Sequence, residues 1–139
     1  MSAPPTSRGE PITDRRQLVE YLEKGNKPAA DWRIGTEHEK FVFRGPDHAP
    51  VPYAGPGGIG EILGEFQRRF GWEPVYEGEN VIALTQGLAN ISLEPGGQFE
   101  LSGAPLSTIH QTCGEVGEHL SQVRAIGKEI GRASCRERV

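Results

Sequence analysis

The stretch 93–105, LEPGGQFELSGAP, carries the strongest fold signal in the sequence. Its Pro-Gly-Gly lies between two runs in which polar and apolar residues alternate, and this pattern predicts a β-hairpin. Side chains alternate across a strand, so pairing Glu94 with Gln98 would place both on one face. Two residues further from the turn, Ser92 and Glu100 would pair on that same face. The apolar residues between them would pack on the opposite face: Ile91, Leu93, Phe99 and Leu101.

An earlier stretch, 33–43 (RIGTEHEKFVF), predicts a second strand with carboxylates on one face. Glu37 and Glu39 share that face by the same alternation, whereas His38 and Lys40 point away from it. We interpret His38 as a hydrogen-bonded structural histidine and Lys40 as a solvated or paired charge. The two predicted segments therefore carry four candidate carboxylates, which together suggest a cation site: Glu37, Glu39, Glu94 and Glu100.

Periodicity alone leaves a plainer alternative open at each of these positions. An acidic residue on a strand is commonly part of a solvated face, and the Pro-Gly-Gly segment would serve equally well as a turn with polar flanks. A zinc site that joins His38 to Glu37 and Glu39 is disfavoured, because the histidine lies on the other face. The two cysteines, Cys113 and Cys135, form neither a disulfide framework nor a zinc pattern.

Composition narrows the class of protein. A chain of 139 residues has room for one domain with a core, and no run approaches the ~18 apolar residues of a membrane span. The net charge of -4 and the lack of a basic stripe oppose binding to nucleic acid. The first residues lack the apolar core of a secretory signal, so we expect a cytoplasmic protein.

The remaining pattern predicts helices beside a sheet. Residues 1–11 are small, polar and proline-bearing, and we expect a flexible tail there. Helices are predicted over 13–24, over 59–70 and from residue 109 onward, and further strands over 73–77 and 81–85. The last helix has an apolar stripe of Ile109, Cys113, Val116, Leu120, Val123 and Ile126, preceded by a capping box of Thr108 and Gln111. These elements predict an α+β fold, an antiparallel sheet with flanking helices.

Two segments resemble the amino-terminal part of glutamate-cysteine ligase, in the lineage shared by plants and many proteobacteria. They are RIGTEHEKFVF at 33–43 and ISLEPGGQFELSGAPLSTIHQTCGEVGEHLSQV at 91–123, and the resemblance extends over residues 12–128. The second segment is long and contiguous, which makes chance agreement a poor explanation. That family is similar in fold to glutamine synthetase-like ligases. The resemblance therefore implies that 12–128 is part of such a catalytic domain.

The resemblance also implies an activity. Family members join the γ-carboxyl of L-glutamate to the amine of L-cysteine through γ-glutamyl phosphate, with ATP as co-substrate and Mg²⁺ as cofactor, in the first step of glutathione biosynthesis. By this resemblance, Gln98 would contact substrate or a metal-bound water. The catalytic and magnesium-binding residues would be Glu37, Glu39, Glu94 and Glu100. Carboxylate oxygens suit magnesium, which would neutralise charge as the phosphoryl group meets a carboxylate.

Several hundred residues are usual in that family, so we expect this chain alone to be inactive. The end, IGRASCRERV, breaks the apolar periodicity and looks like a translated sequencing adapter, so we expect a non-native tail over 129–139. Two other functions stay open: another carboxylate-amine ligase of similar fold, or a metal- or nucleotide-binding module without catalysis. The pattern does not give an oligomeric state.

Overall fold

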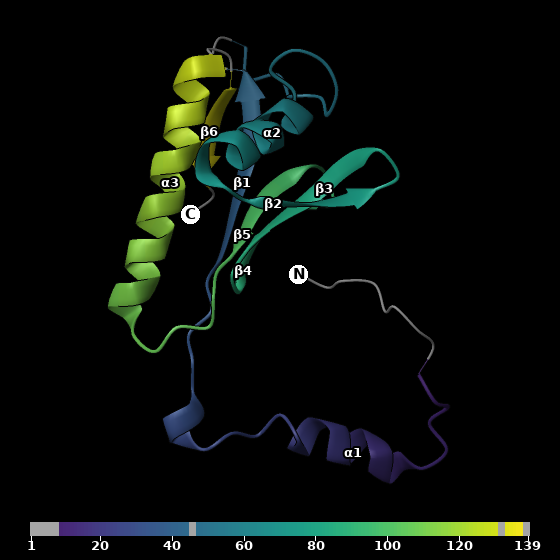
Figure 1. Ribbon diagram of the computed structural model, residues 1–139. Coiled ribbons are helices and arrows are strands. Elements are labelled where there is room, and N and C mark those ends of the chain that lie inside the picture. The colour runs from purple at the N-terminus through teal and green to yellow at the C-terminus, as the bar shows by residue number, and fades with distance from the viewer. Residues whose placement is uncertain (1–8, 45–46, 131–132, 138–139) are drawn as a thin grey trace. The chain divides into compact units, whose positions relative to one another are not determined.

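The computed structural model, which describes residues 9–44, 47–130 and 133–137, contains the predicted hairpin (Figure 1). Strand β4 (Ala89–Glu94) pairs with β5 (Gln98–Ser102), and the pairings of Glu94 with Gln98 and of Ser92 with Glu100 are both confirmed. The turn closes because Gly96 and Gly97 adopt φ values of 82° and 76°. Residues that carry a Cβ rarely adopt such positive values. The Gly97 amide donates to the Glu94 carbonyl at 2.9 Å.

In the described part of the chain, six strands form one sheet in the order β2-β3-β4-β5-β1-β6, and every pairing is antiparallel. The other strands are β1 (Glu37–Arg44), β2 (Glu73–Glu77), β3 (Asn80–Gln86) and β6 (Ala133–Glu137). The α+β fold class is thus confirmed. The backbone of β6 lies within the expected non-native tail, and the origin of that tail stays a prediction.

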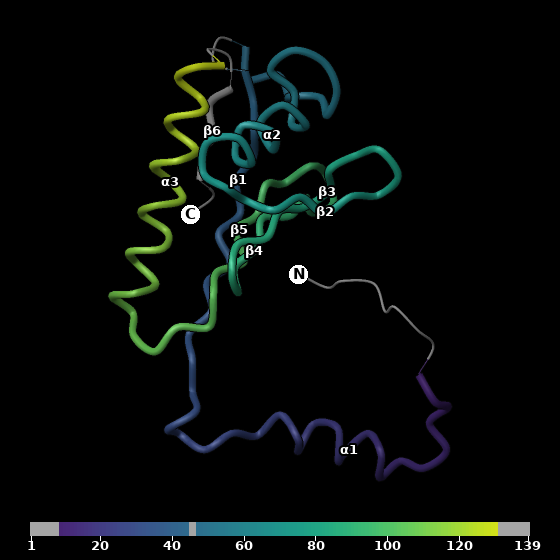
Figure 2. Tube along the Cα trace, viewed as in Figure 1, coloured from purple at the N-terminus to yellow at the C-terminus, as the bar shows by residue number. Residues whose placement is uncertain are grey.

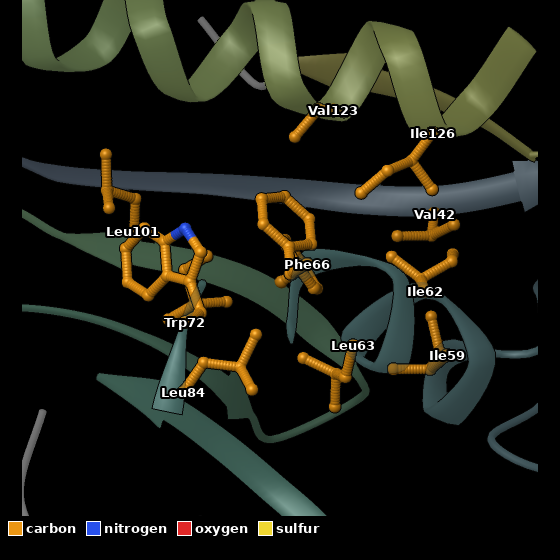
Figure 3. Packing of buried hydrophobic residues seen from close by; sticks show 12 residues of the cluster. Val42, Ile59, Ile62, Leu63, Phe66, Trp72, Leu84, Leu101, Val123 and Ile126 are labelled. Atoms are coloured by element: carbon orange, nitrogen blue, oxygen red, sulfur yellow. The ribbon is translucent and has the colours of Figure 1, made fainter. Parts of the chain in front are cut away.

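Helices α2 (Ile59–Phe70) and α3 (Ile109–Ile130) cover the apolar face of this sheet (Figures 1 and 2). Helix α2 ends where predicted, since Gly71 takes the left-handed conformation with φ 71°. Phe66 of α2 lies at the centre of the core, between strand side chains and the two α3 residues Val123 and Ile126 (Figure 3). The other strongly buried residues of this core are Val42, Ile59, Ile62, Leu63, Trp72, Leu84, Ile91, Phe99 and Leu101.

The buried side of α3 differs from the predicted apolar stripe. Ile109 is 56% exposed and Cys113 is exposed, so the first turns of the stripe do not pack in the described structure. Three polar residues are buried instead: Thr112, His119 and Gln122. The predicted cap does form, since the Thr108 amide donates to Gln111 Oε1 at 3.0 Å and the Gln111 amide donates to Thr108 Oγ1 at 3.3 Å.

Residues 1–33 form a separate compact unit from residues 34–139. The first unit contains helix α1 (Arg15–Glu23) and the short 3₁₀ helix η1 (Ala29–Asp31). Asp14 caps α1, one residue after the predicted start of the helix, and Gln17 completes a capping box. The predicted tail lies outside the described residues up to residue 8. No helix in the described ranges is long and apolar enough to cross a membrane.

Candidate functional site

The sheet face opposite the helices carries the candidate site. Residues that pair across neighbouring strands place their side chains on the same face, so the register gives the layout directly. One row across four strands is Thr85, Asn90, Ser102 and Glu37. The next row is Ala83, Ser92, Glu100 and Glu39, and Glu94 pairs with Gln98 beside it. The four carboxylates therefore share one face, and their role in binding a cation stays a prediction.

The candidate residues differ in solvent exposure. Glu37 and Glu39 on β1 are exposed, whereas Glu94 and Gln98 beside the turn are half-buried. Glu100 is only 4% exposed and lies directly across from Glu39. Like charges in directly opposed positions destabilise a sheet, and among the described residues no lysine or arginine forms an ion pair with either carboxylate. A cation between the two carboxylates would relieve this repulsion.

Hydroxyl groups hold two of the carboxylates in place. Ser102 Oγ donates to Glu100 Oε1 at 2.5 Å, and Ser92 Oγ donates to Glu94 Oε1 at 3.3 Å. Each bond joins residues two apart on one strand, so the alternation itself brings hydroxyl and carboxylate together. Glu100 and Glu94 therefore have restricted orientations on the polar face.

Asn90 belongs to this face, although the sequence reasoning did not single it out. Its Oδ1 atom is buried and has no hydrogen-bond partner among the described residues. The signal was available, because residues 90, 92 and 94 alternate along one strand. Asn90 was not chosen as a candidate because it has no charge, whereas the candidate cation ligands were chosen among acidic residues.

The donor set fits magnesium in its chemistry. Magnesium is usually held by one or two protein carboxylates together with phosphate oxygens and water. Glu39 and Glu100 supply two carboxylates across one strand pair, and Glu94 and Gln98 supply further oxygens nearby. Within the described ranges, no three acidic, histidine or cysteine side chains converge on one metal position. The arrangement thus suits ions that keep other ligands, and not a cage built from the protein alone.

The opposite face holds a buried polar cluster of His38, Lys40 and His119. Lys40 is 1% exposed, which corrects the solvated reading of this lysine. The alternation of β1 turns Lys40 towards the helices, where its Nζ donates to the His38 carbonyl and lies 2.7 Å from His38 Nδ1. The interpretation of His38 as a hydrogen-bonded histidine is confirmed, and the structure adds that it is buried. Burial, helped by the charges of Lys40 and His38, lowers the pKa of His119 to about 3.

The sequence matches a known protein family. The family described as Glutamate-cysteine ligase family 2 (GCS2) matches residues 33–136. The chain is 52% identical over 134 residues to glutamate-cysteine ligase A of Oryza sativa subsp. japonica, and 52% identical to the Nicotiana tabacum ligase. It is 51% identical to that of Arabidopsis thaliana. The chain belongs to the glutamate-cysteine ligase family, as its motifs indicated.

These relatives differ from the chain in length. The matched region covers 94% of this chain but only 26% of the rice enzyme and 25% of the tobacco enzyme. The chain thus spans about a quarter of the length of these relatives.

All three relatives are named as chloroplastic, which contradicts the expected cytoplasmic location. The expectation rested on a signal that does not report on plastids, because plastid transit peptides are Arg- and Ser-rich and amphipathic. The lack of an apolar signal core therefore argues against secretion only.

Proposed function

We propose that residues 12–128 supply the acidic sheet face of an ATP- and magnesium-dependent glutamate-cysteine ligase. The observation that carries the proposal is the pairing of Glu39 with Glu100, one carboxylate exposed and one buried, with Glu94 and Gln98 on the same face. Two opposed carboxylates without a basic partner among the described residues are costly unless a cation joins them. The named activity of the relatives supplies a reaction that needs such a cation.

The chemistry explains why this face is acidic. The reaction would activate the γ-carboxyl of L-glutamate with the terminal phosphoryl group of ATP, and the amine of L-cysteine would then displace phosphate from γ-glutamyl phosphate. Both partners of the first step are anionic, so positive charge must be supplied between them. Magnesium, when bound, supplies that charge and orients the phosphate oxygens.

The chain's own residues have distinct roles in this proposal. Glu100 and Glu94 are held by serine hydroxyls and would provide fixed oxygen ligands. Glu39 and Glu37 are exposed on β1 and would contact the cation from the neighbouring strand. Gln98 has an uncharged amide that both donates and accepts, so it would contact substrate or a metal-bound water.

The test places this segment in a complete enzyme. Residues 12–128 replace the matching region of the Arabidopsis thaliana ligase, to which the chain is 51% identical. Formation of γ-glutamylcysteine is then measured against the concentrations of ATP and magnesium. In this chimera, Glu100→Gln removes one charge at nearly constant volume. We expect at least a hundredfold loss of kcat, about 2.7 kcal/mol, and a higher magnesium requirement.

The matched control is Glu79→Gln, the same change at an exposed position outside the strands. It should leave both kcat and the magnesium requirement unchanged. An active chimera in which Glu100→Gln and Glu39→Gln also keep full kcat at low magnesium would refute the assignment of this face. An active chimera that accepts an amine other than that of cysteine would favour another carboxylate-amine ligase.

A further inference from the structure

A cavity of about 400 Å³ lies on the helix side of the sheet, on the face opposite the candidate ligase site. Its wall includes side chains of α3, the strand residues Ala89 and Leu101, and Trp72. None of the four carboxylates of the polar face lines it. Its volume is within the range of sites that hold small organic molecules. The cavity therefore requires an explanation separate from the proposed ligase chemistry.

His119 projects from α3 into this cavity with unused hydrogen-bonding capacity. The residue is 2% exposed, and neither ring nitrogen has a hydrogen-bond partner among the described residues. Its ring is stacked on Phe66 and Phe99, with centroid separations of 5.8 and 6.2 Å, so it cannot turn freely to find a partner. Because its pKa is lowered to about 3, the imidazole is neutral near pH 7 and offers one acceptor nitrogen and one donor.

Two carboxylates of α3 line the same cavity. Glu115 Oε1 accepts a hydrogen bond from the Ala104 amide at 2.9 Å, while its Oε2 atom is buried and without a hydrogen-bond partner in the described residues. Glu118 lies one turn further along α3 and is exposed. No lysine or arginine is among the described residues that line the cavity. The lining thus carries two carboxylates and no cationic side chain, and the nearest cation described is Lys40, which acts on His119 but does not line the cavity.

Apart from Gln86, Gln111 and Gln122, the rest of the wall is apolar. Trp72 is 6% exposed, and its Nε1 donates to Gln122 Oε1 at 3.2 Å. Leu101 and Leu106 complete an apolar surface beside the indole ring. An aromatic face and aliphatic side chains next to carboxylates favour a cation attached to a short hydrocarbon body.

We propose that this cavity binds a small aliphatic molecule with a primary ammonium group. The ammonium would donate to Glu115 Oε2 and to the acceptor nitrogen of His119, which gives both buried atoms a partner, and Glu118 would add a second charge. The hydrocarbon body would lie against Trp72 and Leu101. An anion would meet two carboxylates, and an uncharged molecule would leave Glu115 unneutralised.

Trp72 provides the readout, since it is one of only two tryptophans in the sequence and lines the cavity. The other tryptophan, Trp32, belongs to the separate unit of residues 1–33. It is replaced by phenylalanine in every protein tested, so that the fluorescence comes from Trp72. The complete chain is titrated with n-butylammonium chloride, and indole fluorescence is followed. Sodium chloride at matched ionic strength and n-butanol, which has the same size without the charge, serve as comparison probes. We expect saturable binding of the amine at least about tenfold tighter than that of the alcohol, a difference of about 1.4 kcal/mol.

Two variants test the carboxylates. Glu118→Gln alters an exposed side chain, and Glu115→Gln keeps an oxygen to accept from Ala104, so both should fold. Each should weaken n-butylammonium binding about tenfold, whereas the control Glu79→Gln should not change it. The proposal is overturned if n-butylammonium gives no saturable change up to about 50 mM, which is well above millimolar affinity. Equal affinity for n-butanol, or unchanged affinity in both cavity variants, would also overturn it. None of these results depends on ligase activity, so they are independent of the proposed function.

Discussion

Replacement of His119 by phenylalanine should remove much of the chain's sensitivity to mild acid. The imidazole is 2% exposed and stacks on the rings of Phe66 and Phe99, which also contact each other. Burial first, then the charges of Lys40 and His38, lower its pKa from 6.5 to about 3. Phenylalanine retains a ring that can stack on the same neighbours but has no nitrogen that can bind a proton.

The sign of the effect follows from the lowered pKa. Between pH 6.5 and pH 3 the unfolded chain binds a proton at this histidine that the folded chain does not, so the free energy of unfolding falls as the pH falls. The full difference would be about 5 kcal/mol, reached near pH 3 and constant below it. At pH 5 the loss relative to pH 7.5 would be about 2 kcal/mol, within the range that denaturant unfolding measures.

The assay is urea unfolding of the complete chain at pH 7.5 and at pH 5. We expect the wild type to lose about 2 kcal/mol more than His119→Phe over this interval. The matched control is His110→Gln, because His110 is an exposed histidine on the same helix and should leave the wild-type pH dependence unchanged. Equal losses in the wild type and His119→Phe would show that His119 does not stay neutral in the folded chain, and the argument would fail.

Two further predictions concern the loop after β5 and the activity of the chain. Gly103→Ala should lower the free energy of unfolding by about 1–3 kcal/mol, because the new methyl group would overlap the carboxylate of Glu115 and disturb its bond to Ala104; a thermal stability equal to wild type would contradict this. The purified 139-residue chain should form no γ-glutamylcysteine from glutamate, cysteine and ATP, because holding reactants together can supply ~7–11 kcal/mol and most of the relatives' length is missing. Product formation above the background of a host free of its own ligase would show that this region alone is sufficient.

The sheet was largely predictable, because its strongest signals are local. Alternation and the Pro-Gly-Gly turn gave both strand pairings of the hairpin, including Ser92 with Glu100. Hydrophobic spacing and Gly71 gave the limits of α2. Strand order was not predictable, because nothing local in the stretch 33–43 indicates that β1 pairs with β5 and not with β4.

The polar interior was missed for a different reason. The alternation that places Glu39 on the polar face also places Lys40 in the interior, yet a lysine is so rarely buried that its charge outweighed the pattern. His119 on α3 was missed for a similar reason, since it is a polar residue that the structure buries. It lies seven residues after Thr112 and seven before Ile126, so it is on the buried side of the helix. The predicted stripe was defined by hydrophobic residues and therefore did not include it.

The two faces of the hairpin also limit how this region can vary in length. Inserting a single residue into the turn at Gly96 would slip β5 by one position against β4, which would bring Glu100 under the helices and turn Phe99 out to the polar face. An insertion of two residues would restore the alternation. Among homologous sequences, length changes within the hairpin should therefore occur as even numbers or together with a compensating bulge. The length of the turn thus decides which side chains reach the polar face.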